Sequence, residues 1–455
     1  MIKNEKDSGQ MSFLLPELAD QLDKTHGLYR LARVINWEYF ENEFTPLYRS
    51  DFGRPALPIR LMVSLLILKY LRNISDESLV EQWAENCYYQ FLSGEKQFKP
   101  TKPCTAPELV TFRKRIGEQG VEKILAESIR INGRDKDENQ LIADTTVQEK
   151  NITFPTDSKL HKKIIDKCLA ISEKEDLTLR QSYRRTVPKL RYQQRGRNHP
   201  KHRKKAIRAD NKMKTIAGRL VRELDRKLPP HHCYNPQLML YKRVLAQKKE
   251  DSNKIYSLHE PDVKCISKGK EHKKYEFGNK VSILRTKTSG VIVGAMSFDT
   301  NLYDGHTLEP ALEQYERLNG KRPQKVIADL GYRGKKQIGE TQIVTPDRFK
   351  KITTKYQKQK HKKDMGRRSS IEPIIGHVKQ DHRLGRNYLK GLPGDHINIL
   401  LAAAAFNFKR FIRLKLNTLL RRLYYTLWCI TQGWKLWSKF YTIQIVPFQW
   451  KIRLF

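Results

Sequence analysis

Two short apolar runs in this chain each end in an aspartate. Leu141-Ile142-Ala143 leads to Asp144, and Val326-Ile327-Ala328 leads to Asp329. Runs of this length and composition are typical of buried β-strands. A carboxylate at the end of a buried strand costs free energy unless it binds a cation. The chain is therefore expected to fold around a sheet in which two neighbouring central strands carry acids to one cation site.

A third acid, Glu372, lies near the start of a segment with helical periodicity, residues 371–379. Packed across the two strands, this helix would bring Glu372 to Asp144 and Asp329. Two strand acids and one helix acid are the parts of a phosphoryl-transfer site that holds two magnesium ions. In such a site Asp144 bridges both ions, and Asp329 and Glu372 each complete one side. Mn2+ is the alternative metal.

The overall charge predicts the substrate class. Lys and Arg number 88 against 49 Asp and Glu, which gives a formal net charge of +39. Such an excess indicates a polyanionic partner, and DNA is the first candidate. Binding of this kind releases counterions and weakens steeply as salt rises. A membrane surface is the alternative, but no lipidation signal is present and no apolar run approaches the ~20 residues of a membrane span.

The cysteines and the N-terminus indicate a compartment. Six cysteines are scattered without a CxxC pair, which is typical of a reduced chain and not of a disulfide framework or zinc module. The first ten residues are polar and mixed in charge, unlike a signal peptide. We therefore expect a cytoplasmic protein that associates with the nucleoid.

Two cations flank Glu372 at helical spacing. Arg368 stands one turn before it and Lys379 about two turns after it, so both can project from the same face. Cations placed there can hold a phosphate near the metals. We predict that Arg368 and Lys379 contact DNA.

The most basic stretch runs from Arg184 to Lys214 and holds thirteen Lys or Arg with one acid, Asp210. Its one-sided charge favours a surface that follows DNA phosphates, although a solvated face or a disordered arm is the alternative. Charge alone cannot read base sequence. The DNA contacts predicted in this stretch are Arg184, Arg185, Arg203, Lys204 and Lys205.

Residues 12–132 are predicted to be helical and to form a DNA-binding domain. Thr105 and Glu108 form a capping box, and the helix that they start carries Arg113, Lys114 and Arg115 as candidate DNA contacts. Gly117 and Gly120 are expected to break this helix before another begins. A helix, a glycine turn and a helix are compatible with a helix-turn-helix, and equally with a plain helical bundle.

The remaining elements predict an α/β fold. Residues 275–285 and 291–298 are expected to form a hairpin, after which helices and strands alternate, as in a mixed sheet. The catalytic core is assigned to 138–157 and 256–412, and a basic helical insertion to 158–255. The aromatic and basic tail, 413–455, could pack on the core, dimerise or contact DNA, and these alternatives stay open.

Three motifs now resemble a known family, the DDE transposases of bacterial insertion sequences in the broad four/five group. Asp144-Thr145-Thr146 matches its D-x-T motif, and Asp329-Leu330-Gly331-Tyr332 matches D-x-G-(Y/F). Arg368, Glu372 and Lys379 match the spacing of Y-x2-R-x3-E-x6-K, with Met365 in place of the tyrosine. That departure affects the contact made by the tyrosine and leaves the three acids in place. The resemblance covers roughly residues 15–410, and it includes the run Asp304-Gly305-His306-Thr307-Leu308 before the second acid.

The resemblance implies a ribonuclease-H-like catalytic core and an N-terminal helical domain that binds terminal inverted repeats. It implies excision and insertion of a DNA element without a covalent protein intermediate, by an oligomer, for which we expect a dimer, acting on paired ends and target DNA. Two alternatives remain. One is a ribonuclease-H-like nuclease that cuts without joining strands, and the other is a DNA-binding protein derived from a transposase that has lost catalysis.

Four further residues are weaker site candidates. They are Asp157, Asp299, Asp304 and His306. We interpret Asp304 as a turn or cap residue.

Overall fold

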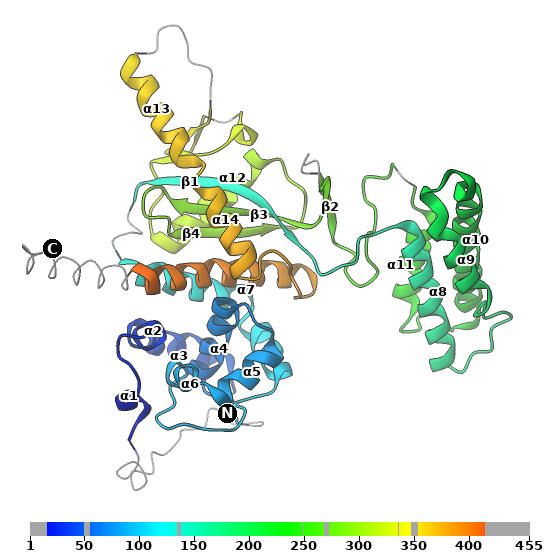
Figure 1. Cartoon of the computed structure of the whole chain (residues 1–455), viewed down its shortest axis with the longest axis horizontal. Helices are drawn as coiled ribbons and strands as arrows, with labels where there is room; N and C mark the ends of the chain where they lie inside the picture. Colours follow the sequence, from blue (N-terminus) through cyan, green and yellow to red (C-terminus); the bar gives the residue numbers. More distant parts are fainter. Residues whose placement is uncertain are drawn as a thin grey trace, which may run out of the picture.

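The computed structural model describes residues 16–49, 55–133, 138–248, 250–267, 273–334, 336–346 and 354–414. It contains an N-terminal group of helices, a mixed sheet with covering helices, and a helical insertion that stands apart from the sheet (Figure 1). Nearly all of the tail at 413–455 lies outside the described residues. Among the described helices, none is both long and apolar enough to cross a membrane.

The N-terminal part is built around α4 (Ile59–Arg72), which is apolar on all sides. Every residue from Leu61 to Leu71 is buried, and Asn73 ends the helix in the left-handed conformation. The helices around it are α1 (Leu18–Gln21), α2 (Gly27–Val34), α3 (Trp37–Phe44), α5 (Asp76–Glu85), α6 (Cys87–Leu92) and α7 (Ala106–Ile131), with the short 3-10 helix η1 (Thr45–Leu47) after α3.

One expectation about α7 was wrong. The helix starts at the predicted capping box and kinks at Gly117, whose φ is 60°. Gly120, however, continues the helix. A Cβ at that position would lie 3.2 Å from Cε1 of Phe44, so this glycine permits close packing and does not break the helix.

The sheet has seven strands centred on the long strand β3 (Tyr275–Thr286). β1 (Gln140–Glu149) pairs antiparallel with one edge of β3, while β2 (Lys264–Ser267) and β4 (Ile292–Phe298) pair antiparallel with the other. Next to β1 come β5 (Lys325–Ile327), β7 (Thr341–Val344) and β6 (Gln337–Ile338); β5 is parallel to both β1 and β7. This arrangement confirms the predicted mixed α/β sheet and the ribonuclease-H-like core.

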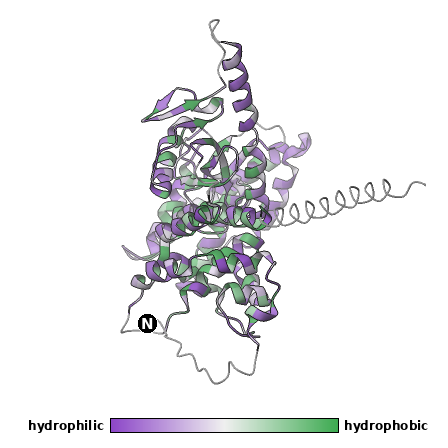
Figure 2. Ribbon diagram, turned by 90° about the vertical axis from the view of Figure 1, so that its left-hand side faces the viewer, coloured by the Kyte–Doolittle hydropathy of each residue, from purple (hydrophilic) through white to green (hydrophobic). Residues whose placement is uncertain are grey.

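Four helices cover or extend the sheet. α12 (Asp304–Asn319) packs on β3 and β4, and α14 (Ile371–Asp381) packs on β1. A helix at 391–414 runs between the sheet and the N-terminal helices (Figure 1). α13 (Lys355–Arg368) projects from the core and is hydrophilic along its length (Figure 2). Its one buried residue, Asp364, binds Lys287 and Lys325 at the base of the helix.

The insertion has its own apolar core. It consists of α8 (Asp157–Lys174), α9 (Thr186–Gln194), the 3-10 helix η3 (Arg195–Asn198), α10 (Pro200–Lys227) and α11 (Asn235–Ala246). Leucine, isoleucine and valine side chains from all four α-helices form a buried cluster separate from that of the sheet. The polar and basic composition therefore belongs to the surface of a packed unit.

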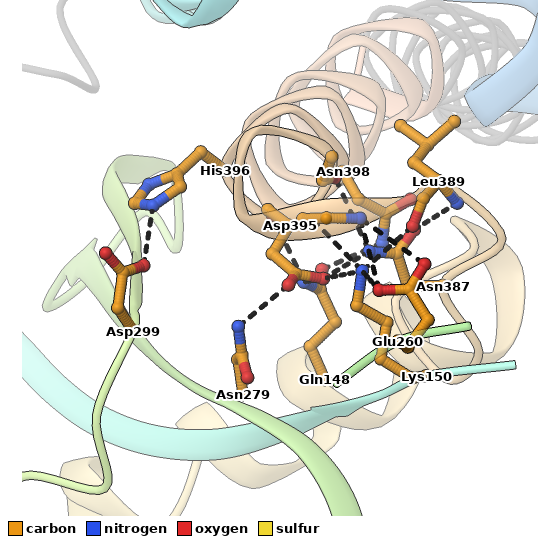
Figure 3. Close-up of polar contacts among 12 residues, drawn as sticks. Gln148, Lys150, Glu260, Asn279, Asp299, Asn387, Leu389, Asp395, His396 and Asn398 are labelled. Atoms are coloured by element: carbon orange, nitrogen blue, oxygen red, sulfur yellow. Dashed lines mark hydrogen bonds and ion pairs between the residues drawn. The ribbon is translucent and has the colours of Figure 1, made fainter. Parts of the chain in front are cut away.

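A buried polar network joins β1 to the helix at 391–414 (Figure 3). Lys150, just after β1, places Nζ 2.9 Å from Oδ1 of Asp395 and 3.3 Å from Oε2 of Glu260. Asn279 and Asn387 donate hydrogen bonds of 2.7 Å and 2.6 Å to the Asp395 carboxylate. Burial raises the pKa of Asp395 to about 6, although the ammonium of Lys150 opposes this shift.

Replacing Asp395 by alanine is expected to lower the free energy of unfolding of the core by about 3 kcal/mol, because Lys150 loses its closest buried counter-charge. Denaturant titration followed by circular dichroism measures the loss. The matched control is Asp225→Ala, which removes an exposed partner of Lys242 and should cost less than about 1 kcal/mol. Equal costs for the two variants would show that the buried network does not stabilise the core.

The end of α14 is bonded to the N-terminal helices. Nδ1 of His382 lies 2.9 Å from the carbonyl oxygen of Tyr70, and the Tyr70 hydroxyl donates a 2.8 Å hydrogen bond to Asn398. Burial lowers the pKa of His382 to about 4. The ring is therefore neutral near pH 7, with Nδ1–H donating to Tyr70.

Acid is expected to weaken this junction. His382 would titrate near 6.5 in the unfolded chain and near 4 in the fold, so the unfolded state binds more protons between these values and stability falls as the pH drops below 6.5. At pH 5 this ring alone should cost about 2 kcal/mol. Unfolding at pH 7 and pH 5 should show a smaller acid loss in His382→Asn than in the wild type. An unchanged loss, equal to that of the exposed control His377→Asn, would contradict the prediction.

Candidate active site

The strand register places Asp144 beside Asp329. The parallel ladder between β1 and β5 ends at the pair Ile142 and Ile327. Asp144 lies two residues further along β1, and Asp329 lies two residues beyond the end of β5 in extended conformation. The alternation of side chains therefore places both acids on one face of the sheet. Asp144 was expected at the end of its strand. It lies instead in the middle of β1, because β3 continues to pair with that strand as far as Glu149.

Local backbone contacts orient both carboxylates. The N–H of Thr145 donates to Oδ1 of Asp144 at 2.8 Å, and the N–H of Gly331 donates to Oδ1 of Asp329 at 2.8 Å. The second bond caps the 3-10 helix η4 (Leu330–Tyr332), so β5 ends where Asp329 begins the turn. The D-x-T and D-x-G-Y motifs thus supply the donors that hold their own acids.

Asp304, named above as a weaker site candidate and interpreted as a turn or cap residue, lies beside these two acids. Its Oδ1 accepts hydrogen bonds from the Thr145 hydroxyl at 2.8 Å and from Nζ of Lys280 at 2.9 Å. A Cβ on Gly331 would lie 2.7 Å from Oδ2 of Asp304 and 3.0 Å from Oδ1 of Asp329. The glycine therefore leaves room for the close approach of the two carboxylates. In the sequence, only the resemblance of the run 304–308 to the family could have indicated that Asp304 lies near Asp144 and Asp329.

Tyr332 reports the combined charge of the three aspartates. Burial raises the pKa of its hydroxyl well above the usual value, and Asp144, Asp304 and Asp329 raise it further. Clustered carboxylates repel one another, so a bound cation would relieve the repulsion. Hard oxygen ligands of this kind match the preference of Mg2+ and Mn2+. The donor chemistry therefore fits the expected metals.

Glu372 lies on α14, which packs on β1, and its side chain is mostly exposed. α14 buries Ile371, Ile375 and Val378, whereas the Glu372 side chain is 65% exposed and lies 3.8 Å from Nη2 of Arg368. Within the described ranges, no three Asp, Glu, His or Cys side chains are close enough together to hold a metal. The expected pair of strand acids is brought together, and in the described part of the chain Glu372 does not complete a group of three with them.

Seven of the ten predicted DNA contacts are exposed, whereas Arg368 and Lys379 are half-buried and Arg113 is buried. Arg113 was expected to contact DNA, but its side chain is 4% exposed and donates two hydrogen bonds to Asp76. It stabilises the N-terminal helices and is not available to DNA in this fold. Lys114 and Arg115 are exposed, and Arg115 stacks 4.2 Å from the Tyr48 ring centroid.

The insertion presents the remaining basic candidates to solvent. All five predicted contacts of the insertion, which lie just before α9 and at the start of α10, are exposed: Arg184, Arg185, Arg203, Lys204 and Lys205. Arg184 pairs with Glu173, and its side chain remains 65% exposed. The first turns of α10 are exposed on nearly all sides until Ala206. This end of the helix can therefore contact a large polyanion without rearrangement.

Two family models match the chain. Residues 16–115 match a transposase domain (DUF772), and residues 247–408 match a transposase DDE domain. The uncharacterized protein ORF8 in the nfe locus of Rhizobium meliloti is 38% identical over 190 residues, which are 41% of this chain and 91% of that protein. No solved structure matches the chain. Asp329 and Glu372 lie within the second match, whereas Asp144 and the helical insertion lie between the two.

Proposed function

Because this chain belongs to the DDE transposases of bacterial insertion sequences, we propose that it cleaves DNA at the ends of an insertion sequence and joins those ends to a target. Water first attacks a phosphodiester and leaves a 3′-hydroxyl. That hydroxyl then attacks a phosphodiester of the target, so one P–O bond forms for each that breaks. The two steps use the same acidic site.

The observation that carries this proposal is the register of β1 and β5. It supports a site in which Asp144 and Asp329 hold metal from adjacent strands. Glu372, on α14, is the proposed third ligand. Bound Mg2+, or Mn2+, would activate the attacking oxygen and stabilise the leaving oxygen. In the proposed site, Asp144 would bind both ions, and Asp329 and Glu372 would each bind one of them. Arg368 holds Glu372, and Asp304 positions Thr145 and Lys280 beside the two aspartates.

DNA binding is proposed for cations of three surfaces, all of them exposed except the half-buried Arg368 and Lys379. Lys114 and Arg115 belong to the N-terminal helices, and Arg368 and Lys379 belong to the catalytic core. The insertion contributes Arg184, Arg185, Arg203, Lys204 and Lys205. We propose that a homodimer binds two terminal inverted repeats on these surfaces, in the cytoplasm and at the nucleoid.

The direct test uses a labelled duplex that carries one end of the element, cloned from the DNA flanking the gene, together with an unlabelled target plasmid. Magnesium should give cuts at the element end and labelled plasmid, and EDTA should abolish both products. Cuts without labelled plasmid would favour the nuclease that does not join strands. Binding without cuts would favour the DNA-binding protein that has lost catalysis.

A further inference from the structure

The loop that follows α14 forms a cationic pocket outside the acidic site. Its volume is about 360 Å3, and its lining residues are Asn73, Lys379, Arg383, Gly385, Arg386 and Tyr388. Three of these six side chains are cationic and none is acidic. The pocket is therefore suited to an anion.

The chain doubles back tightly to build this pocket. The N–H of Leu384 donates to the carbonyl of Val378 at 3.2 Å, and the N–H of Gly385 donates to that of Lys379 at 3.0 Å. A Cβ on residue 385 would lie 2.8 Å from the Lys379 carbonyl oxygen, so a glycine at this position lets the chain pass close to the end of α14. These bonds also satisfy carbonyls at the C-terminal end of α14 that would otherwise repel an anion.

The opposite wall comes from the N-terminal helices. Asn73 has a φ of 57° at the end of α4, and its Nδ2 donates a 2.9 Å hydrogen bond to the carbonyl of Gln380. Figure 1 shows the end of α14 reaching the N-terminal helices at this place. A ligand in the pocket would therefore touch both the N-terminal part and the catalytic core.

The surroundings add positive charge. Behind the pocket, Lys69 and Arg113 share a single carboxylate, Asp76, at 2.9 Å and 2.6 Å. Burial lowers the pKa of Lys69 to about 8, and the charges of Arg113 and Arg383 contribute to the shift. Asp381, the acid at the end of α14, is bound by Lys409 at 3.0 Å.

The two arginines are presented to solvent in different ways. Arg386 is exposed, and Arg383 is half-buried with its guanidinium 5.2 Å from the centroid of the Tyr388 ring. This contact limits the rotamers of Arg383. Tyr388 is itself 56% exposed, so its side of the pocket is open to solvent. Less conformational entropy is then lost when an anion binds.

We propose that this pocket binds a phosphate group of the DNA backbone, with Arg383 and Arg386 as its principal ligands beside Lys379. The inference rests on the proposed function, because it concerns the DNA on which that site acts. It adds a DNA-binding site formed by both the N-terminal helices and the core. A phosphate bound there would fix one DNA strand relative to Glu372, which lies on α14 with Lys379.

The first test compares DNA binding by the double variant Arg383→Gln with Arg386→Gln against the wild type, without metal, over a range of salt concentrations. Loss of one phosphate contact should reduce the slope of log K against log salt by about 1 and weaken binding about tenfold at physiological salt. The control is Lys24→Gln with Lys321→Gln, which removes two exposed cations elsewhere and should leave the slope unchanged. An unchanged slope in the pocket variant overturns the proposal.

A second measurement alters the DNA as well as the protein. Duplexes in which single phosphates are replaced by neutral methylphosphonates should reveal one position that weakens wild-type binding about tenfold and does not affect the double variant. If no position behaves in this way while inorganic phosphate alone binds the wild type and not the variant, the pocket takes free phosphate and the DNA assignment fails.

These outcomes are independent of the catalytic proposal. Magnesium-dependent cleavage by the wild type, with an unchanged salt slope in the pocket variant, would retain the proposed function and reject the pocket. A reduced slope in a protein that never cleaves would retain the pocket and reject the catalytic function.

Discussion

Asp144→Asn should abolish magnesium-dependent cleavage and leave DNA binding nearly intact. The amide keeps the size of the side chain and an oxygen that can accept from the Thr145 N–H, but it removes the negative charge that would bind both metals. Metal catalysis supplies several kcal/mol of transition-state stabilisation, so the cleavage rate should fall at least about a thousandfold. Asp329→Asn and Glu372→Gln should do the same. Rates of cleavage and dissociation constants would be measured on the same labelled duplex.

The matched control is Asp262→Asn, which alters an exposed aspartate in the loop before β2 and should cleave like the wild type. Near-normal cleavage by Asp144→Asn would refute the proposed site. Loss of binding in all three active-site variants would mean that the acids support the fold, and circular dichroism would then show a changed structure. Glu372→Gln is the most informative of the three, because its side chain is mostly exposed and, among the described residues, forms no metal-binding group with the two aspartates.

Replacing Arg203, Lys204 and Lys205 together by alanine should cause the second large effect, on binding. Each lost phosphate contact should lower the slope of log K against log salt by about 0.9, so the slope of the triple variant should fall by up to about 2.7. The affinity at physiological salt should fall on the order of a hundredfold. The helix should survive, because these residues lie on its exposed first turns and alanine favours helix formation. Fluorescence anisotropy at several salt concentrations measures both quantities.

The control for this variant is a second triple, Lys24→Ala with Lys274→Ala and Lys321→Ala, which removes the same charge from exposed positions elsewhere. If both triples lower the slope equally, the basic stretch acts only through net charge. Cleavage by the Arg203 triple at saturating protein should stay close to that of the wild type. A defect that persists at saturation would instead place this stretch near the reacting phosphodiester.

The sheet and its two acids could be predicted because their signals are local. A short apolar run followed by an acid identifies both a strand and the position of its carboxylate, as at Asp144 and Asp329. The capping box at Thr105 is equally local, and it occurs as predicted. Residues within a few positions of one another determine each of these features.

The features that were missed depend on partners far away in the sequence. Arg113 looked like a DNA contact because its partner Asp76 lies on another helix. Asp304 was only a weaker site candidate, because its partners Thr145 and Lys280 come from two separate strands. Gly120 looked like a helix breaker because the nearby Phe44 belongs to α3. The outward direction of Glu372 depends on how α14 packs against β1, which no spacing within the motif specifies.

The separate apolar core of the insertion has a consequence for the order of folding. β1 emerges first during synthesis and must wait for β3, its main partner, until the whole insertion has followed. Pairing strands across a long flexible chain is slow, because closing the intervening loop costs entropy. An insertion that collapses early on its own brings the two connecting segments together and shortens the effective loop. The insertion would then act as an internal folding aid, so that slowing its collapse should delay assembly of the sheet even in the absence of DNA.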